Sequence, residues 1–266
     1  MTTTQQSAHR PAVDRFVDRH PFATFVLLAY GISWSLWAAA YAGAGDVPFF
    51  AGVLGPMVAA IFVLRRTGAS LGDWTASLVR WRVGARWWVY ALGLPIGLYA
   101  VVSLVLQLLG HPVDWGLAID RAPAYAATWL FVLVLGGALE EPGWRGFGLP
   151  HLLGTRSPLR ATLIIGLVWG VWHVPLYGPL GFVVPLVLAF FYTYLWARTR
   201  SALLCVVLHA SFTPAQDNLV LMARERAYSH ALDAPDIVII TVYVAAAALL
   251  LLVTKGRLGV PDTRGR

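Results

Sequence analysis

The chain has 266 residues, of which 58% are hydrophobic and 12% are charged, and its mean hydropathy is +0.67. This composition is typical of a polytopic membrane protein and excludes a large soluble domain, because every long stretch of the chain contains apolar segments. The net charge of +7 comes from basic residues between the apolar runs, where they would meet lipid headgroups, and it does not indicate a nucleic-acid partner. The single cysteine, Cys205, excludes an internal disulfide and a cysteine-based zinc site.

Apolar runs long enough to cross a bilayer predict eight transmembrane helices. In chain order they cover residues 22–43, 47–64, 87–110, 125–150, 159–179, 181–196, 202–222 and 237–253. Between the second and third runs, residues 71–86 mix Leu, Trp and Val with arginines, which predicts an amphipathic segment at the membrane surface. We therefore expect an all-α membrane protein with a single domain, 22–254, between an N-terminal segment, 1–21, and a C-terminal tail, 255–266.

The distribution of basic residues predicts the orientation of these helices. With the N-terminus in the cytoplasm, sixteen of the 20 Lys and Arg residues fall on the cytoplasmic side, and three, Arg121, Arg224 and Arg226, fall outside. This split favours eight spans with both termini in the cytoplasm. Arginine outnumbers lysine nineteen to one, which is typical of a high-GC genome. The expected location is therefore the plasma membrane of a bacterium.

Besides Arg160 and Asp217 near the ends of their runs, five ionisable side chains lie within the apolar runs: Glu140, Glu141, Arg145, His173 and His209. A charge at the bilayer centre costs roughly 2.5–3.5 kcal/mol even on lenient insertion scales, so such residues face protein or water and by default mark a functional site. Two carboxylates, an arginine and two imidazoles are groups that can activate water. We expect them to meet in a polar cavity enclosed by the helices, in the cytoplasmic half or near the midplane. The alternative is an interhelical polar network without chemistry.

The segment from Glu140 to Arg145 predicts different tasks for its two glutamates. Glu141 and Arg145 are four residues apart, so a continuous helix would bring them together. Glu140 points about 100° away and is free to act as a general base. Pro142 and Gly143 predict a kink or break directly after the glutamates, and irregular backbone at this depth indicates a water-lined pocket.

The two histidines allow two kinds of site. They can orient a water or donate to a developing oxyanion. Alternatively, Glu140, His173 and His209 can bind a divalent metal such as zinc. The sequence contains no His-Glu-x-x-His motif, so its spacing does not favour a metal over a water held by protein groups.

Three motifs in order, each in its own predicted span, resemble the CPBP family. They are Glu140-Glu141-x-x-x-Arg145, Trp169-x-x-x-His173 and His209-x-x-x-Thr213. This family comprises the CAAX-processing and bacteriocin-immunity membrane proteases, related to type II CAAX prenyl endopeptidases, and the similarity covers about 125–222. The resemblance implies that Glu140 activates water, that Glu141 and Arg145 support it, and that the two histidines orient water or stabilise an oxyanion.

The sequence departs from the family pattern at two positions. Trp169 stands where the second motif usually begins with Phe, and Thr213 stands where the third usually ends in Asn. A threonine hydroxyl donates one hydrogen bond and reaches less far than an asparagine amide, which weakens oxyanion stabilisation unless a neighbour compensates. Gln216, seven residues after His209, is a candidate for that compensation.

The function expected from these observations is an intramembrane endopeptidase that cuts a peptide or membrane-protein substrate near the cytoplasmic face. The alternative is a non-proteolytic relative of the same fold that gives bacteriocin immunity or acts as a membrane scaffold. A proton-coupled transporter would also explain buried Glu and His, but the sequence shows no inverted repeat.

Overall fold

A computed structural model describes residues 12–222 and 233–261, and within these ranges the chain is helical and contains no strand. The expected all-α class is therefore confirmed. Arg224 and Arg226, counted above on the outer side, lie outside the described residues.

The helices follow the predicted apolar runs, with short helices and turns between or within them. The N-terminal part contains α1 (Ala12–Arg19), α2 (Pro21–Ala39) with a following π turn (Ala40–Ala44), α3 (Asp46–Val53), α4 (Gly55–Thr67) and α5 (Leu71–Leu78). The rest contains α6 (Ala85–Leu108), α7 (Leu117–Asp120), α8 (Ala122–Val134), α9 (Glu141–Gly143), α10 (Leu149–Leu153), α11 (Pro158–Tyr177), α12 (Val183–Thr199), α13 (Ala202–Asn218) and α14 (Ala234–Val253).

Five helical segments among the described residues are long and apolar enough to cross a membrane, namely Pro21–Ala44, Ala85–Leu108, Ala122–Leu153, Pro158–Tyr177 and Ala234–Val253. The pair α3 and α4, bent by 48°, adds a sixth if it forms one span. The sixth and seventh predicted spans correspond to α12 and α13, which have 17 residues each. The chain is thus a multi-pass membrane protein, while the count of eight and the orientation remain predictions.

The bend between α3 and α4 has a local cause. Pro56 has no N–H to donate to the carbonyl of Gly52, four residues earlier. The hydroxyl of Ser33 on α2 donates to that carbonyl instead, at 2.7 Å. A β-carbon on Gly55 would lie 2.1 Å from the Ser33 Oγ atom, so glycine is needed for this close approach of α2.

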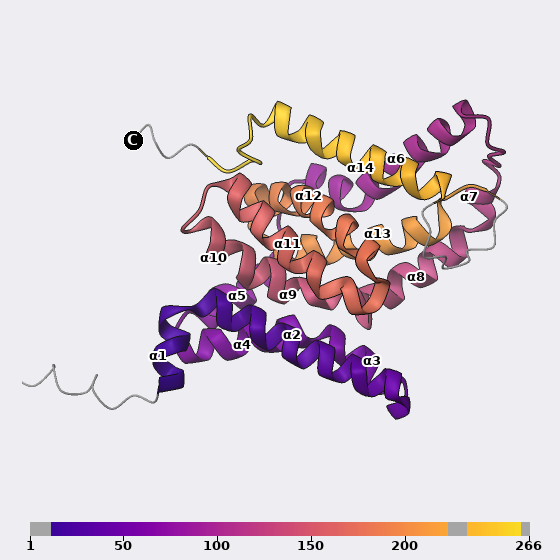
Figure 1. Cartoon of the computed structure of the whole chain (residues 1–266). Helices are drawn as coiled ribbons and strands as arrows, with labels where there is room; N and C mark the ends of the chain where they lie inside the picture. The colour runs from indigo at the N-terminus through magenta and orange to yellow at the C-terminus, as the bar shows by residue number, and fades with distance from the viewer. Residues whose placement is uncertain (1–11, 223–232, 262–266) are drawn as a thin grey trace, which may run out of the picture.

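The helices pack in layers around residues 137–148, which carry the two glutamates and are called the glutamate segment below. In Figure 1, α2, α3 and α4 form one side of the molecule, α11, α12 and α13 lie in the middle, and α6 and α14 cover the opposite side. The α4 helix packs against α9, and α13 packs against both α8 and α9. Tyr30 and Trp34 on α2 donate hydrogen bonds to backbone carbonyls of α11. The glutamate segment is therefore enclosed by helices from both halves of the chain.

The α5 helix lies within the predicted amphipathic segment 71–86. Ser70 caps its first turn by accepting a hydrogen bond from the backbone N–H of Asp73, at 3.0 Å. Trp74 is its buried residue, and the indole N–H donates to the backbone carbonyl of Pro142 at 2.9 Å. This helix is thereby attached to the glutamate segment.

Candidate active site

The helix that carries the glutamates breaks before them. The helix is not broken at Pro142 and Gly143, because both residues have helical backbone, but it changes directly after them to a π turn, Trp144–Gly148. Upstream of the glutamates, α8 ends at Val134, Gly136 is extended (φ −107°, ψ −158°), and a 3₁₀ turn covers Gly137–Glu140. The tighter turn explains why Pro142 is tolerated. The backbone N–H of Glu141 donates to the carbonyl of Ala138, which would otherwise lack the donor that a proline cannot supply.

Glu141 joins two of the predicted site residues. Its Oε1 accepts a hydrogen bond from Nη1 of Arg145 at 2.9 Å, as the four-residue spacing predicted. The same oxygen lies 2.9 Å from Nδ1 of His209 on α13. Glu141 and Arg145 are fully buried, and His209 is 9% exposed. A pair of opposite charges here thus fixes the position of an imidazole from another helix.

Arg145 is held between two aromatic rings. Its guanidinium carbon lies 3.9 Å from the centre of the Trp169 ring and 4.1 Å from the centre of the Tyr192 ring. Such contacts stabilise a desolvated cation by about 2 kcal/mol. They matter because Nε and Nη2 of Arg145 find no hydrogen-bond partner among the described residues. Sequence reasoning missed Tyr192, which lies in a uniformly apolar helix and is separated from Arg145 by 47 positions in the sequence.

Glu140 uses its two oxygens differently. Oε2 accepts a hydrogen bond from the indole N–H of Trp169 at 2.8 Å. Oε1 lies 3.9 Å from Nε2 of His173 and makes no hydrogen bond to a described residue. The carboxylate is 3% exposed. Phenylalanine, the usual residue at position 169 in the family pattern, has no N–H to donate. The tryptophan of this chain therefore gives Glu140 a hydrogen bond that phenylalanine could not.

Both histidines present Nε2 to the space beside Glu140. Nδ1 of His173 lies 2.9 Å from the backbone carbonyl of Trp169, which can only accept, so Nδ1 must donate. Nδ1 of His209 faces the Glu141 carboxylate in the same way. In the neutral ring, Nε2 of each histidine is then an acceptor. A β-carbon built on Gly137 would lie 2.8 Å from Nε2 of His209 and 3.0 Å from Oε1 of Glu140, so these two atoms border one space.

The structure therefore brings the five buried ionisable residues together, as expected from the sequence. Glu140 comes from the 3₁₀ turn, Glu141 and Arg145 follow on the next turns, and the histidines come from α11 and α13. For metal binding, the described part of the chain contains no group of three or more His, Cys, Asp or Glu side chains that could hold a metal ion, so Glu140, His173 and His209 do not form the metal site considered above.

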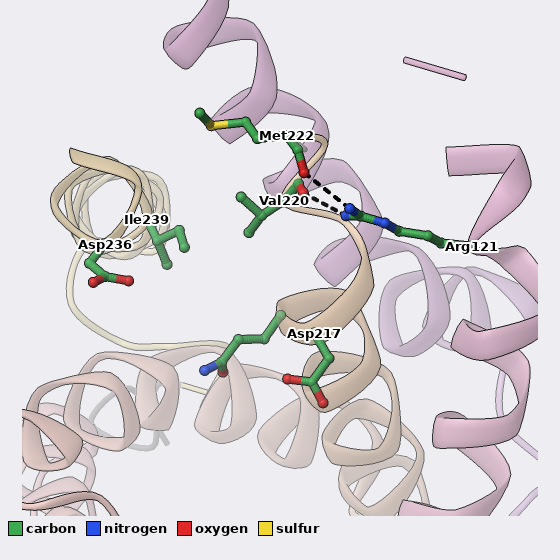
Figure 2. Close-up of a pocket in the computed structure, with 7 residues that line it drawn as sticks. Arg121, Asp217, Val220, Met222, Asp236 and Ile239 are labelled. Carbon is green, nitrogen blue, oxygen red and sulfur yellow. Dashed lines mark hydrogen bonds between the residues drawn. The ribbon is translucent and has the colours of Figure 1, made fainter. Parts of the chain in front are cut away.

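Thr213 lies one turn after His209 on α13 and is partly exposed, and its hydroxyl makes no hydrogen bond to any described residue. Gln216 does not line the space beside Glu140. It lines a separate pocket with Arg121, Asp217, Val220, Met222, Asp236 and Ile239 (Figure 2). The structure thus gives no support to Gln216 as a substitute for the missing asparagine.

Arg121, which lines the pocket around Gln216, contacts the chain that follows α13. It donates to the carbonyl oxygens of Val220 and Met222 at 2.9 and 3.0 Å, as Figure 2 shows. Both residues lie beyond the end of α13 at Asn218, and the carbonyl of Val220 also accepts from the backbone N–H of Met222 at 2.8 Å. The arginine thereby attaches this segment to the start of α8.

The fold and these contacts define a class of protein, a multi-pass helical membrane protein with a buried carboxylate and imidazole site. Comparison with known proteins makes the class more specific. The family model "Type II CAAX prenyl endopeptidase Rce1-like" matches residues 122–213, a range that includes every predicted site residue. The "CAAX prenyl protease 2" of Methanococcus maripaludis is 40% identical over 47 residues, which are 18% of this chain and 17% of that relative. These matches support the CPBP, or CAAX-protease, family for this chain and confirm the resemblance carried by the three motifs. The aligned region spans less than a fifth of the length of the relative.

Proposed function

We propose that this protein is an intramembrane endopeptidase that hydrolyses peptide bonds with a water activated by Glu140. The observation that carries the proposal is the asymmetry of the Glu140 carboxylate. Trp169 holds Oε2, while Oε1 makes no hydrogen bond to any described residue and lies 3.9 Å from Nε2 of His173. A general base needs one oxygen that is fixed in place and free to take a proton, and this arrangement supplies it.

The reaction follows from the donors and acceptors around Oε1. Water gives a proton to Oε1 of Glu140 as its oxygen bonds to the carbonyl carbon of the scissile peptide. Nε2 of His173, an acceptor in the neutral ring, orients the second hydrogen of that water. The tetrahedral intermediate then collapses, the C–N bond breaks, and Glu140 returns the proton to the leaving amine. The products are a carboxylic acid and an amine, the second water proton passes from the acid to the amine to give a carboxylate and an ammonium group, and Glu140 is regenerated.

His209 is suited to stabilise the negative oxygen of that intermediate. Its Nδ1 is 2.9 Å from Glu141, so a positive charge on the imidazole would be balanced by a neighbouring carboxylate. The protonated ring would then present an N–H at Nε2 to the oxyanion. Arg145 and its two aromatic neighbours hold Glu141 in position, which makes them supports of His209.

The substrate proposed on these grounds is a peptide or a segment of a membrane protein that reaches the site within the bilayer. The relatives are named for CAAX prenyl proteins, so a prenylated CAAX peptide is the first substrate to test. We further propose a bacterial plasma-membrane location with cytoplasmic termini, on the basis of the basic-residue distribution.

The decisive variant is Glu140→Gln. Glutamine has the same shape and still accepts from the Trp169 indole, but it cannot take a proton from water. We expect cleavage to be abolished while the protein still folds. Purified wild type and variant should be compared on a fluorogenic prenylated CAAX peptide, and cells expressing each should be compared by membrane proteomics. Asp46→Asn, at the exposed start of α3, is the matched control.

Unchanged cleavage by Glu140→Gln would refute the proposed base. If neither wild type nor variant cleaves any peptide or membrane protein, the non-proteolytic immunity or scaffold function of the same fold would replace the proposal.

A further inference from the structure

Gly137 differs from the neighbouring glycines in what its missing side chain would touch. The three heavy atoms nearest to a β-carbon there all belong to the site, with Nε2 of His209 at 2.8 Å, Oε1 of Glu140 at 3.0 Å and Cε1 of His209 at 3.3 Å. On Gly143, by contrast, a β-carbon would lie 2.4 Å from the backbone carbonyl of Pro56. Gly143 is thus required by helix packing, whereas Gly137 borders only side chains of the site.

The backbone does not require glycine at position 137. Its φ angle lies outside the positive range that L-residues rarely adopt, so alanine can take the same conformation. The atoms nearest to the methyl group of that alanine belong to two side chains of the site, so the close contacts would fall on Glu140 and His209 and not on the main chain. What glycine provides at position 137 is therefore room for the side chains of Glu140 and His209 and for the space between them.

We propose that Gly137 keeps open the space between Oε1 of Glu140 and Nε2 of His209 in which the scissile peptide bond meets the water. This inference rests on the proposed function. Proton transfer needs the reacting groups within about 2.6–3.2 Å of the base. A methyl group on residue 137 would lie 3.0 Å from Oε1 of Glu140 and 2.8 Å from Nε2 of His209. It would therefore fill part of the space within that distance of the base. Gly137 is thus a steric determinant of catalysis, distinct from the residues that supply donors and acceptors.

The test is Gly137→Ala, measured beside Glu140→Gln on the same substrate. Displacement of reacting groups by about 1 Å costs about 100-fold in rate, so we expect kcat/KM to fall about 100-fold or more, with most of the loss in kcat. The unfolding temperature should stay close to that of wild type. Gly97→Ala, on the exposed side of α6 with nothing within 4 Å, is the control and should be fully active. Gly143→Ala should unfold at a lower temperature.

Each outcome bears on the inference. Wild-type activity of Gly137→Ala, with Glu140→Gln inactive, would overturn the role of Gly137 and leave the proposed function standing. A loss of stability equal to that of Gly143→Ala would also overturn it, because the glycine would then serve packing. Full activity of Glu140→Gln would overturn the proposed function and this inference together.

Discussion

Arg145 is the residue whose removal should cost the most stability. It is fully buried, pairs with Glu141 at 2.9 Å, and lies between the rings of Trp169 and Tyr192. Arg145→Met keeps the apolar stem and removes the guanidinium. The change leaves the carboxylate of Glu141 in a low-dielectric interior with the imidazole of His209 as its remaining partner.

The expected magnitude follows from these contacts. Breaking a buried ion pair by removing one partner costs about 3–5 kcal/mol of unfolding free energy, because a buried charge is left uncompensated. Since His209 still donates to Glu141, we expect a value near the lower end of this range. The double variant Arg145→Met/Glu141→Gln removes both charges. It should therefore recover stability, with a coupling of about 0.5–3 kcal/mol relative to the sum of the single variants.

The assay is chemical unfolding of the purified protein in detergent micelles, with both single variants, the double variant and wild type measured in parallel. Arg156→Met, which removes an exposed arginine, is the control and should change stability by less than about 0.5 kcal/mol. If the double variant loses as much stability as the two single variants combined, the ion pair is not the cause and the reasoning fails.

Three further predictions concern the site and the topology. Trp169→Phe should lower kcat about 10-fold or more in steady-state assays, because a hydrogen bond to a charged group is worth about 1.5–3 kcal/mol and Glu140 would lose it; unchanged kcat would show that the bond has no catalytic role. Thr213→Val should lower activity, by up to about 10²–10³ if the hydroxyl is a full oxyanion donor, while Thr213→Asn should preserve or raise it. Equal activity of these two variants and wild type would exclude a catalytic Thr213. Reporter fusions after Gly110 and after Arg266 should read outside and inside respectively, and a cytoplasmic signal after Gly110 would contradict the eight-span topology.

The sequence predicts what depends on local spacing. Apolar runs place the helices to within several residues, and the interval of four between Glu141 and Arg145 predicts their contact. The motif order also predicts that His173 and His209 meet the glutamates. These inferences succeed because each rests on helical periodicity or on the high cost of burying a charge.

Contacts between distant segments could not be predicted in this way. Nothing in the spacing of Tyr192 indicates that its ring packs on Arg145, since that contact depends on how α12 crosses the glutamate segment. The position of the helix break was also missed, because the rule for Pro142 assumes a regular α-helix before it. In the 3₁₀ turn, the backbone N–H of Glu141 donates to the carbonyl of Ala138. Pro142, which has no N–H, therefore does not leave this carbonyl without a donor.

Two of the helices around the site are shorter than the membrane is thick. At 1.5 Å per residue, the 17 residues of α12 and of α13 extend about 25 Å, against about 30 Å for a typical hydrocarbon core. The difference must be met by a thinner bilayer, by side chains that reach the interface, or by oligomerisation. For the proposed hydrolysis this shortfall concerns the supply of water, which is a co-substrate and dissolves poorly in hydrocarbon. About one missing helical turn shortens the distance over which water must travel through the protein to reach Glu140.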